Sequence, residues 1–156
     1  VVASVSAACL LLASCGGSDP ATPAVPALQG VAATGAALAN ALVTAKCVSG
    51  APIVGTTAAD GSFTLSLAGG QTAPCMLQVV GGTPSVTLHS YATAAGRVNV
   101  TPLTDLAVTK ALGTDPAIAF ASFDSAKSGV ISAGLEAAKT YTNTQVAAIG
   151  TMATMP

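Results

Sequence analysis

The stretch that decides the fold lies near the middle of the chain and reads Thr57-Ala58-Ala59-Asp60-Gly61-Ser62-Phe63-Thr64-Leu65. Asp60-Gly61 is a strong signal for a β-hairpin turn, because both residue types tolerate the backbone angles that a tight turn needs. After the turn, Phe63 and Leu65 alternate with polar neighbours, which is the pattern of a strand with one buried face. We therefore predict a β-hairpin with its turn at Asp60 and Gly61.

Short apolar runs continue on both sides of this stretch. They lie at residues 28–34, 38–47 and 53–57 before it, and at 75–80, 85–92 and 97–100 after it. In the second run we expect Leu38, Leu42 and Val43 to be the apolar members. Glycine pairs such as Gly69-Gly70 separate the runs. Many short strands at this spacing predict a β-sandwich over residues 28–100.

From Thr101 onward the pattern is helical. Thr101-Pro102 provides an N-cap followed by proline at the first helical position, and Asp115-Pro116 repeats the device. We predict one helix ending near Gly113, a short one over 117–123, a third over 125–142 and a fourth over 144–155. Four residues should form the apolar stripe of the third helix: Val130, Ile131, Leu135 and Ala138. The expected fold is thus mainly β, followed by a small α-helical region over 101–156.

The chain begins with an apolar run that ends in Leu12-Ala13-Ser14-Cys15. The run is too short to span a bilayer, which takes about 20 residues, and it fits the apolar part of a signal peptide. Small residues before a cysteine resemble a bacterial lipobox. We expect residues 1–14 to be removed and Cys15 to carry lipid, including palmitate. An ordinary secretory signal is the alternative. The Val at position 1 suggests that the signal peptide starts upstream.

Residues 15–27 are rich in Gly, Ser and Pro and contain no apolar pattern, so we expect a tether between the lipid and the folded part. Gly16, rather than Asp, follows Cys15. By resemblance to enterobacterial lipoproteins this favours the outer membrane, on either its periplasmic or its surface face. The helical region ends without a clear stop signal, so we expect that further sequence follows it.

Two cysteines, Cys47 and Cys75, remain outside the N-terminal segment. In an exported protein such a pair most simply forms a disulfide. That bond would close a loop of about 28 residues, for which the chain-entropy model gives roughly 3–4 kcal/mol. A metal or redox pair is the alternative, and the wide spacing and lack of a nearby histidine disfavour it.

The segment from Gly30 to Leu67 resembles the carboxypeptidase regulatory-like domains, which have a transthyretin-like (prealbumin-like) β-sandwich. The matching residues are Gly30-Val31, Gly35-Ala36-Ala37-Leu38, Ala41-Leu42-Val43 and the hairpin motif from Thr57 to Leu65. Ala37 stands where the family usually has Pro. A wider set of residues also resembles uncharacterised exported lipoproteins of proteobacteria: Cys47, Pro74-Cys75, Leu88-His89-Ser90 and residues 98–105. The resemblance implies an accessory module without catalytic machinery.

A search for catalytic chemistry supports the same view. His89 is the only histidine, and it shares a strand face with Thr87 and Tyr91, which we expect to point toward solvent or the helices. No Gly-x-Ser-x-Gly elbow surrounds any serine, and the acidic residues are scattered. An enzyme would need a pocket where His89, Arg97 or Asp105 converge with other polar groups. We expect no catalytic residues, no metal site and no cofactor.

Composition narrows the function classes further. Only 7% of residues are charged and the net charge is −1, against roughly 25% charged residues in an average soluble domain. Without a basic patch, nucleic acid is excluded as an expected partner. The sequence therefore favours a lipid-anchored envelope protein that binds a protein or glycan partner or has a structural role. The alternative is an accessory domain, or a fragment, of an envelope hydrolase.

Overall fold

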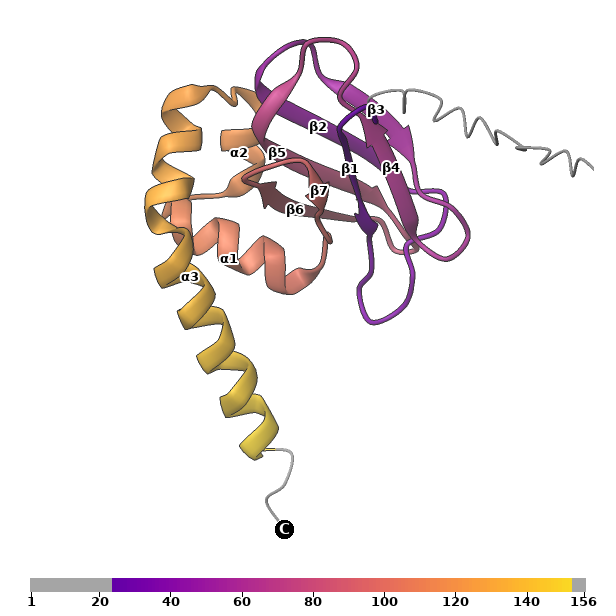
Figure 1. Cartoon of the computed structure of the whole chain (residues 1–156). Coiled ribbons are helices and arrows are strands. Elements are labelled where there is room, and N and C mark those ends of the chain that lie inside the picture. Colours follow the sequence, from indigo (N-terminus) through magenta and orange to yellow (C-terminus); the bar gives the residue numbers. More distant parts are fainter. Residues whose placement is uncertain (1–23, 153–156) are drawn as a thin grey trace, which may run out of the picture.

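The computed structural model describes residues 24–152, so the signal peptide and lipobox expected from the sequence lie outside the described residues. Seven strands precede three helices (Figure 1). The strands are β1 Ala27–Val31, β2 Leu42–Ser49, β3 Ile53–Thr56, β4 Ser62–Ser66, β5 Thr72–Gly81, β6 Val86–Ala92 and β7 Gly96–Arg97. The helices are α1 Pro102–Leu112, α2 Pro116–Ala121 and α3 Ser125–Met152.

The strands form two sheets, in agreement with the predicted β-sandwich. The smaller sheet has the order β4-β1-β7 and the larger one the order β3-β2-β5-β6. All pairings are antiparallel except that of β1 with β7, which is parallel. One cluster of buried side chains lies between the sheets and includes Leu28, Val43, Phe63, Leu77 and Val79. Phe63 and Leu65 are buried while Thr64 and Ser66 are exposed, as the alternation predicted.

The prediction of a β-hairpin at Asp60 and Gly61 is wrong in its pairing. The turn itself exists: Gly61 donates its backbone N–H to Ala58 O at 3.0 Å and has a φ of +78°. However, the strands on its two sides, β3 and β4, belong to different sheets. The turn is therefore a corner at which the chain crosses the sandwich. A turn signal reports a reversal of direction, and it does not report which strand supplies the hydrogen bonds.

The second predicted strand starts later than expected. Asn40 has a positive φ of 53° and separates Leu38 from β2. Both Leu38 and Val43 are buried, but Leu42 points away from the sandwich core and is 49% exposed. Thr57 fixes this entry to the strand, since its hydroxyl accepts a hydrogen bond from Ala41 N at 2.8 Å.

The first two helices begin where the sequence predicted. The Thr101 hydroxyl accepts from Thr104 N, and Pro102 occupies the first turn of α1. Gly113 ends α1 with a φ of +69°. The Asp115 carboxylate accepts from Ala117 N at 2.8 Å at the start of α2. Local capping chemistry thus sets these boundaries.

The third and fourth predicted helices are one continuous helix, α3. Nothing between Thr142 and Thr144 interrupts it, because the polar residues there are tolerated in a helix and no Pro or helix-ending Gly follows. Val130 is also not part of the packed stripe, since it is 51% exposed, whereas Ile131 is fully buried. Gly134 lies against α1: a Cβ there would come within 2.9 Å of Ala111 O, so glycine permits the close approach of the two helices.

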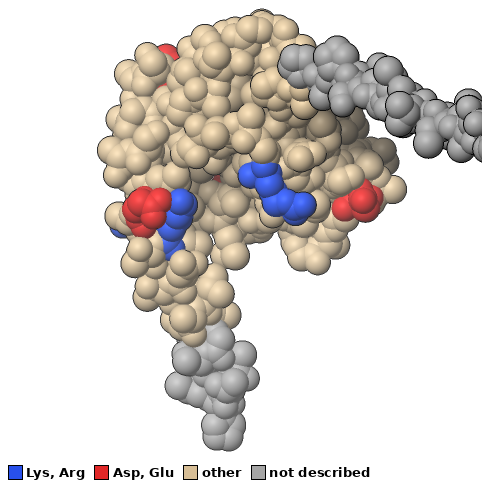
Figure 2. All heavy atoms as spheres, in the orientation of Figure 1, with Lys and Arg blue, Asp and Glu red and all other residues tan. Residues whose placement is uncertain are grey.

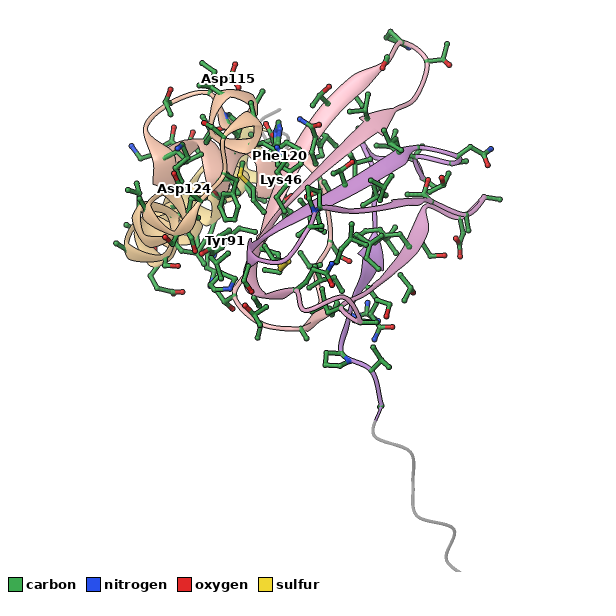
Figure 3. The ribbon with its side chains drawn as sticks, turned by 90° about the horizontal axis from the view of Figure 1, so that it is seen from above. Lys46, Tyr91, Asp115, Phe120 and Asp124 are labelled. Carbon is green, nitrogen blue, oxygen red and sulfur yellow. A yellow bond between two sulfur atoms is a disulfide. The ribbon has the colours of Figure 1, made fainter. Side chains whose placement is uncertain are left out.

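The helices cover part of one face of the larger sheet (Figures 1 and 3). A second buried cluster fills this interface and consists of Met76 from β5 with Val108, Ala119, Phe120 and Ile131 from the helices. The C-terminal half of α3 extends past the rest of the molecule (Figure 1). Among the described residues, no helix has both the length and the apolar character needed to cross a membrane.

Candidate functional site

The residues with chemically active side chains gather under the helices, on the outer face of the larger sheet. Successive outward positions on β2, β5 and β6 are brought into register by strand pairing, so that Gln78 lies beside His89 and Met76 beside Tyr91. Lys46 lies on the other side of Met76. We call Lys46, Gln78, His89, Tyr91 and Asp105 the polar layer. It is the candidate site, because it holds the single histidine of the chain and a carboxylate.

His89 is the centre of this layer and is 2% exposed. Its Nδ1 lies 2.8 Å from Oδ1 of Asp105, and its backbone N–H donates to the same oxygen at 2.8 Å. Its Nε2 lies 3.0 Å from the amide nitrogen of Gln78. A carboxylate accepts and an amide NH₂ donates, so these partners place one proton on Nδ1 and leave Nε2 as an acceptor.

This geometry places His89 and Asp105 together as in a catalytic dyad, but it leaves the base without access to a substrate. The outer nitrogen, Nε2, is occupied by Gln78. The Phe120 ring packs against the imidazole with its centroid 5.9 Å away. Thr104 adds a further tie by donating its hydroxyl to His89 O at 3.0 Å. The pair therefore holds the start of α1 against β6.

Lys46 performs the same task for α2. Its Nζ donates to Phe120 O at 2.8 Å and to Ala121 O at 2.9 Å. These carbonyls lie at the C-terminal end of α2, where backbone acceptors lack helical partners and a positive charge is favourable. The ammonium also lies 4.8 Å from the centroid of the Phe120 ring. Figure 3 shows Lys46 and Phe120 next to each other where the helices meet the sheet.

Tyr91 connects the sheet to α3. Its hydroxyl oxygen lies 2.7 Å from the hydroxyls of both Ser128 and Ser132, and it donates to Ser128 O at 3.0 Å as a further option. Ser128 is 4% exposed although it is polar. Among the side chains of residues 24–149, every buried nitrogen or oxygen has a hydrogen-bond partner. The polar layer is thus a set of satisfied contacts.

The two cysteines expected to pair do so. Cys47 and Cys75 lie directly opposite each other on β2 and β5 and are joined by a disulfide with an S–S distance of 2.02 Å. Both side chains belong to the cluster between the sheets. Among the described residues, no three His, Cys, Asp or Glu side chains are grouped so that they could hold a metal ion.

The remaining candidate residues have local roles or lie elsewhere. The Asp60 carboxylate accepts from Ser62 N at 2.9 Å, and hydrogen bonds from the Ser62 side chain and backbone lower the pKa of Asp60. Arg97 lies on β7, in the other sheet from His89. It lines a hollow of about 240 Å³ on the smaller sheet, together with Gln29, Gly30, Val31, Ser62, Phe63 and Thr64. Leu12, Ala13, Ser14 and Cys15 lie outside the described residues.

Sequence reasoning missed Lys46 and Gln78, which carry much of the polar layer. The signal for Gln78 was a polar residue inside the apolar run 75–80, and the signal for Lys46 was a charge inside the run 38–47. Charged groups are rare on the whole molecule, and the face in Figure 2 is almost entirely uncharged. No family model, no curated protein and no solved structure matches the chain.

Proposed function

We propose that the chain is an exported cell-envelope protein, anchored through lipid on Cys15, whose sandwich has a binding or structural role rather than a catalytic one. The observation that carries the proposal is the disulfide between Cys47 and Cys75. Disulfides of this buried kind persist in oxidising compartments and are rare in the cytosol. Export in turn gives a purpose to the apolar segment that ends at Cys15.

The non-catalytic role is supported by the way the polar layer is used. An acid–base group must reach the proton that it transfers, within about 3 Å or through one water. His89 is buried, and both of its ring nitrogens are already engaged by Asp105 and Gln78. Lys46 donates to a helix carbonyl, and the Tyr91 hydroxyl is hydrogen-bonded to a serine. Through these contacts, the chemically active side chains hold the helices against the sheet.

We further propose that the sandwich is of the transthyretin-like class, as in the carboxypeptidase regulatory-like domains. Support comes from the two sheets of three and four strands. The turn of the motif is present at Asp60 and Gly61, although it joins the two sheets instead of forming a hairpin. The hollow of about 240 Å³ beside Arg97 offers one shallow place for a protein or glycan, lined by both polar and apolar residues.

The anchor is tested by metabolic labelling of the host with an alkyne palmitate analogue. The complete gene is expressed as wild type, as Cys15→Ala and as Cys9→Ala, which removes a cysteine from the same segment and is the matched control. We expect label on the wild type and on Cys9→Ala, and none on Cys15→Ala. An unlabelled wild type would overturn the anchor. Protease treatment of intact cells then separates the two faces of the outer membrane, since only a surface-facing domain is cleaved.

The compartment is tested independently of the lipid. Chains recovered from the host are treated with a thiol-reactive maleimide, with and without prior reduction. We expect Cys47 and Cys75 to react only after reduction and unfolding. Reaction of both thiols without reduction would show that the chain resides in a reducing compartment, and the proposal of export would then be wrong.

A further inference from the structure

The two halves of α3 have different surroundings. In the first half, a helical stripe is buried against α1 and the sheet at Ser128, Ile131, Ala138 and Thr142. From Asn143 to Ile149, every side chain is exposed. Figure 1 shows this second half leaving the body of the molecule past the start of α1. We call residues 143–152 the arm.

The buried stripe continues onto the arm without a partner. Val146 and Ile149 follow Thr142 by four and seven positions, so all three share one face of the helix. Thr142 is 7% exposed, whereas Val146 is 43% and Ile149 66% exposed. The arm therefore presents in solution the same face that the first half of α3 buries.

The composition of the arm makes an isolated helix unfavourable. It contains no charged residue, so no ion pair between successive turns can stabilise it. Its threonines, Val146 and Ile149 are β-branched and have low helix propensity. Short isolated helices are marginal in water even for good helix formers, and most helical stability comes from packing of the apolar face. The arm thus needs a surface to pack against.

A groove of suitable size adjoins the arm. A hollow of about 320 Å³ opens between α1 and α3 and is lined by Leu103, Thr104, Ala107, Lys139, Thr142 and Asn143. It adjoins a second hollow of about 200 Å³, which shares Thr104, Ala107 and Lys139 and reaches Tyr91 on β6. Leu103 is 49% exposed at the edge of the groove. Because Thr142 lines the groove and also belongs to the stripe, groove and stripe lie on one continuous surface.

We propose that this surface binds a second copy of the same chain. In a symmetric pair, the α3 helices run antiparallel, and the arm of each copy lies in the groove between α1 and α3 of the other. Val146 and Ile149 would then contact Leu103 and Ala107 of the second copy. A twofold interface requires one self-complementary patch, and a protruding apolar ridge next to a groove on the same surface meets that requirement.

Charge favours a second copy over a charged partner. The arm is neutral, so two arms can approach without like-charge repulsion, and it offers no ion pair to an acidic or basic helix. Two lysines adjoin this part of α3, and both already have partners: Lys139 is paired with Glu136 at 2.7 Å, and Lys110 Nζ lies 4.7 Å from the centroid of the Tyr141 ring. The contact is short, about 15 Å along each arm at 1.5 Å per residue. We therefore expect a weak dimer near the lower size limit of specific interfaces, about 1,000 Å² in total.

The first experiment measures the mass of the full chain by sedimentation equilibrium in a density-matched detergent. The wild type should pass from monomer to dimer with increasing concentration over the micromolar range. The double variant Val146→Lys, Ile149→Lys should raise the dissociation constant at least about tenfold. Lysine is a better helix former than valine or isoleucine, so the effect does not require loss of the helix, which circular dichroism verifies. Ala147→Lys, on the opposite face, is the matched control and should dimerise like the wild type.

The second experiment tests the geometry by disulfide trapping between two purified chains with different tags. One chain carries Ile149→Cys and the other Leu103→Cys, and a mild oxidant should join them. Replacing the first chain by Ala147→Cys should abolish the product. A wild type that stays monomeric, or a dimer that all three lysine substitutions leave unchanged, would overturn the proposal. Binding of the monomer to phospholipid vesicles through Val146 and Ile149 would instead assign the face to a membrane surface, and would also overturn it. None of these results depends on the lipid anchor.

Discussion

The two faces of the larger sheet are packed by different means. The inner face, with Val43, Leu77 and Val79, meets the smaller sheet in a broad apolar core that also contains the disulfide. The outer face meets the helices through a smaller cluster around Met76 and through the polar layer. The inner interface is held by many apolar packing contacts, whereas the outer one depends on a few directional hydrogen bonds. Substitutions on the inner face should therefore weaken the whole domain, and those on the outer face should loosen the helices first.

The largest effect is expected on the inner face. Leu77→Ala removes a fully buried side chain and should cost about 3–4 kcal/mol in the free energy of unfolding, because a cavity remains. Urea unfolding followed by circular dichroism measures the loss. Leu42→Ala is the matched control, since Leu42 lies on the same sheet, faces outward and is 49% exposed; it should cost less than about 1 kcal/mol. Equal losses would contradict the assignment of the inner core.

The second effect concerns the disulfide. The variant Cys47→Ala, Cys75→Ala should lower the free energy of unfolding by about 3 kcal/mol, since the unfolded chain is no longer constrained by the bond. Reductant should lower the thermal midpoint of the wild type and leave that of the variant unchanged. If reductant shifts both proteins equally, the effect does not come from this bond.

The third effect tests the outer face. Asp105→Ala leaves the buried His89 ring and backbone N–H without their acceptor, at a cost of about 2 kcal/mol. Compared with the wild type, the variant should show a larger increase in the rate of amide hydrogen exchange in α1 and α2 than in β2 and β5. Asp105→Asn keeps an acceptor oxygen at the same place and should therefore lose less free energy of unfolding than Asp105→Ala. Uniformly faster exchange over the whole domain would show that the two faces are not independent.

The smallest effect is a dependence on pH at the start of α3. Hydrogen bonds from the backbone and then the side chain of Lys127 lower the pKa of Asp124 from 3.8. Its stabilisation is therefore complete above 3.8 and is lost as the pH falls through the lower pKa of the folded state. Asp124→Asn should remove this part of the pH dependence of the thermal midpoint. Thr101→Ser, in a cap that does not titrate, should follow the wild-type profile.

The sequence predicted those parts of the fold that depend on neighbouring residues. The caps at Thr101 and Asp115, the end of α1 at Gly113 and the alternation at Phe63 and Leu65 all appear where expected. Each depends on contacts within a few positions of the chain. The disulfide was also predicted, because only two cysteines were left to pair.

The predictions that were wrong share one cause, which is packing between residues that are distant in the sequence. The turn at Asp60 and Gly61 could not reveal that β3 pairs with β2 and β4 with β1. The exposure of Leu42 and Val130 depends on which face another element covers. His89 is buried because α1 and α2 pack over β6. No pattern in the neighbouring residues predicted this burial. The alternation of residues in the strand placed His89 on one face of β6. The packing of other elements decided whether that face is buried or exposed.

By itself, the sequence determined the class of fold, the helix caps, the disulfide partners and the sparse charge of the surface, since these follow from local chemistry and from counting residues. The tertiary structure alone decided the strand partners, the satisfied polar layer around His89 and the exposed face of the arm. These properties exist only when segments distant in sequence meet, because burial and hydrogen-bond satisfaction belong to both sides of a contact.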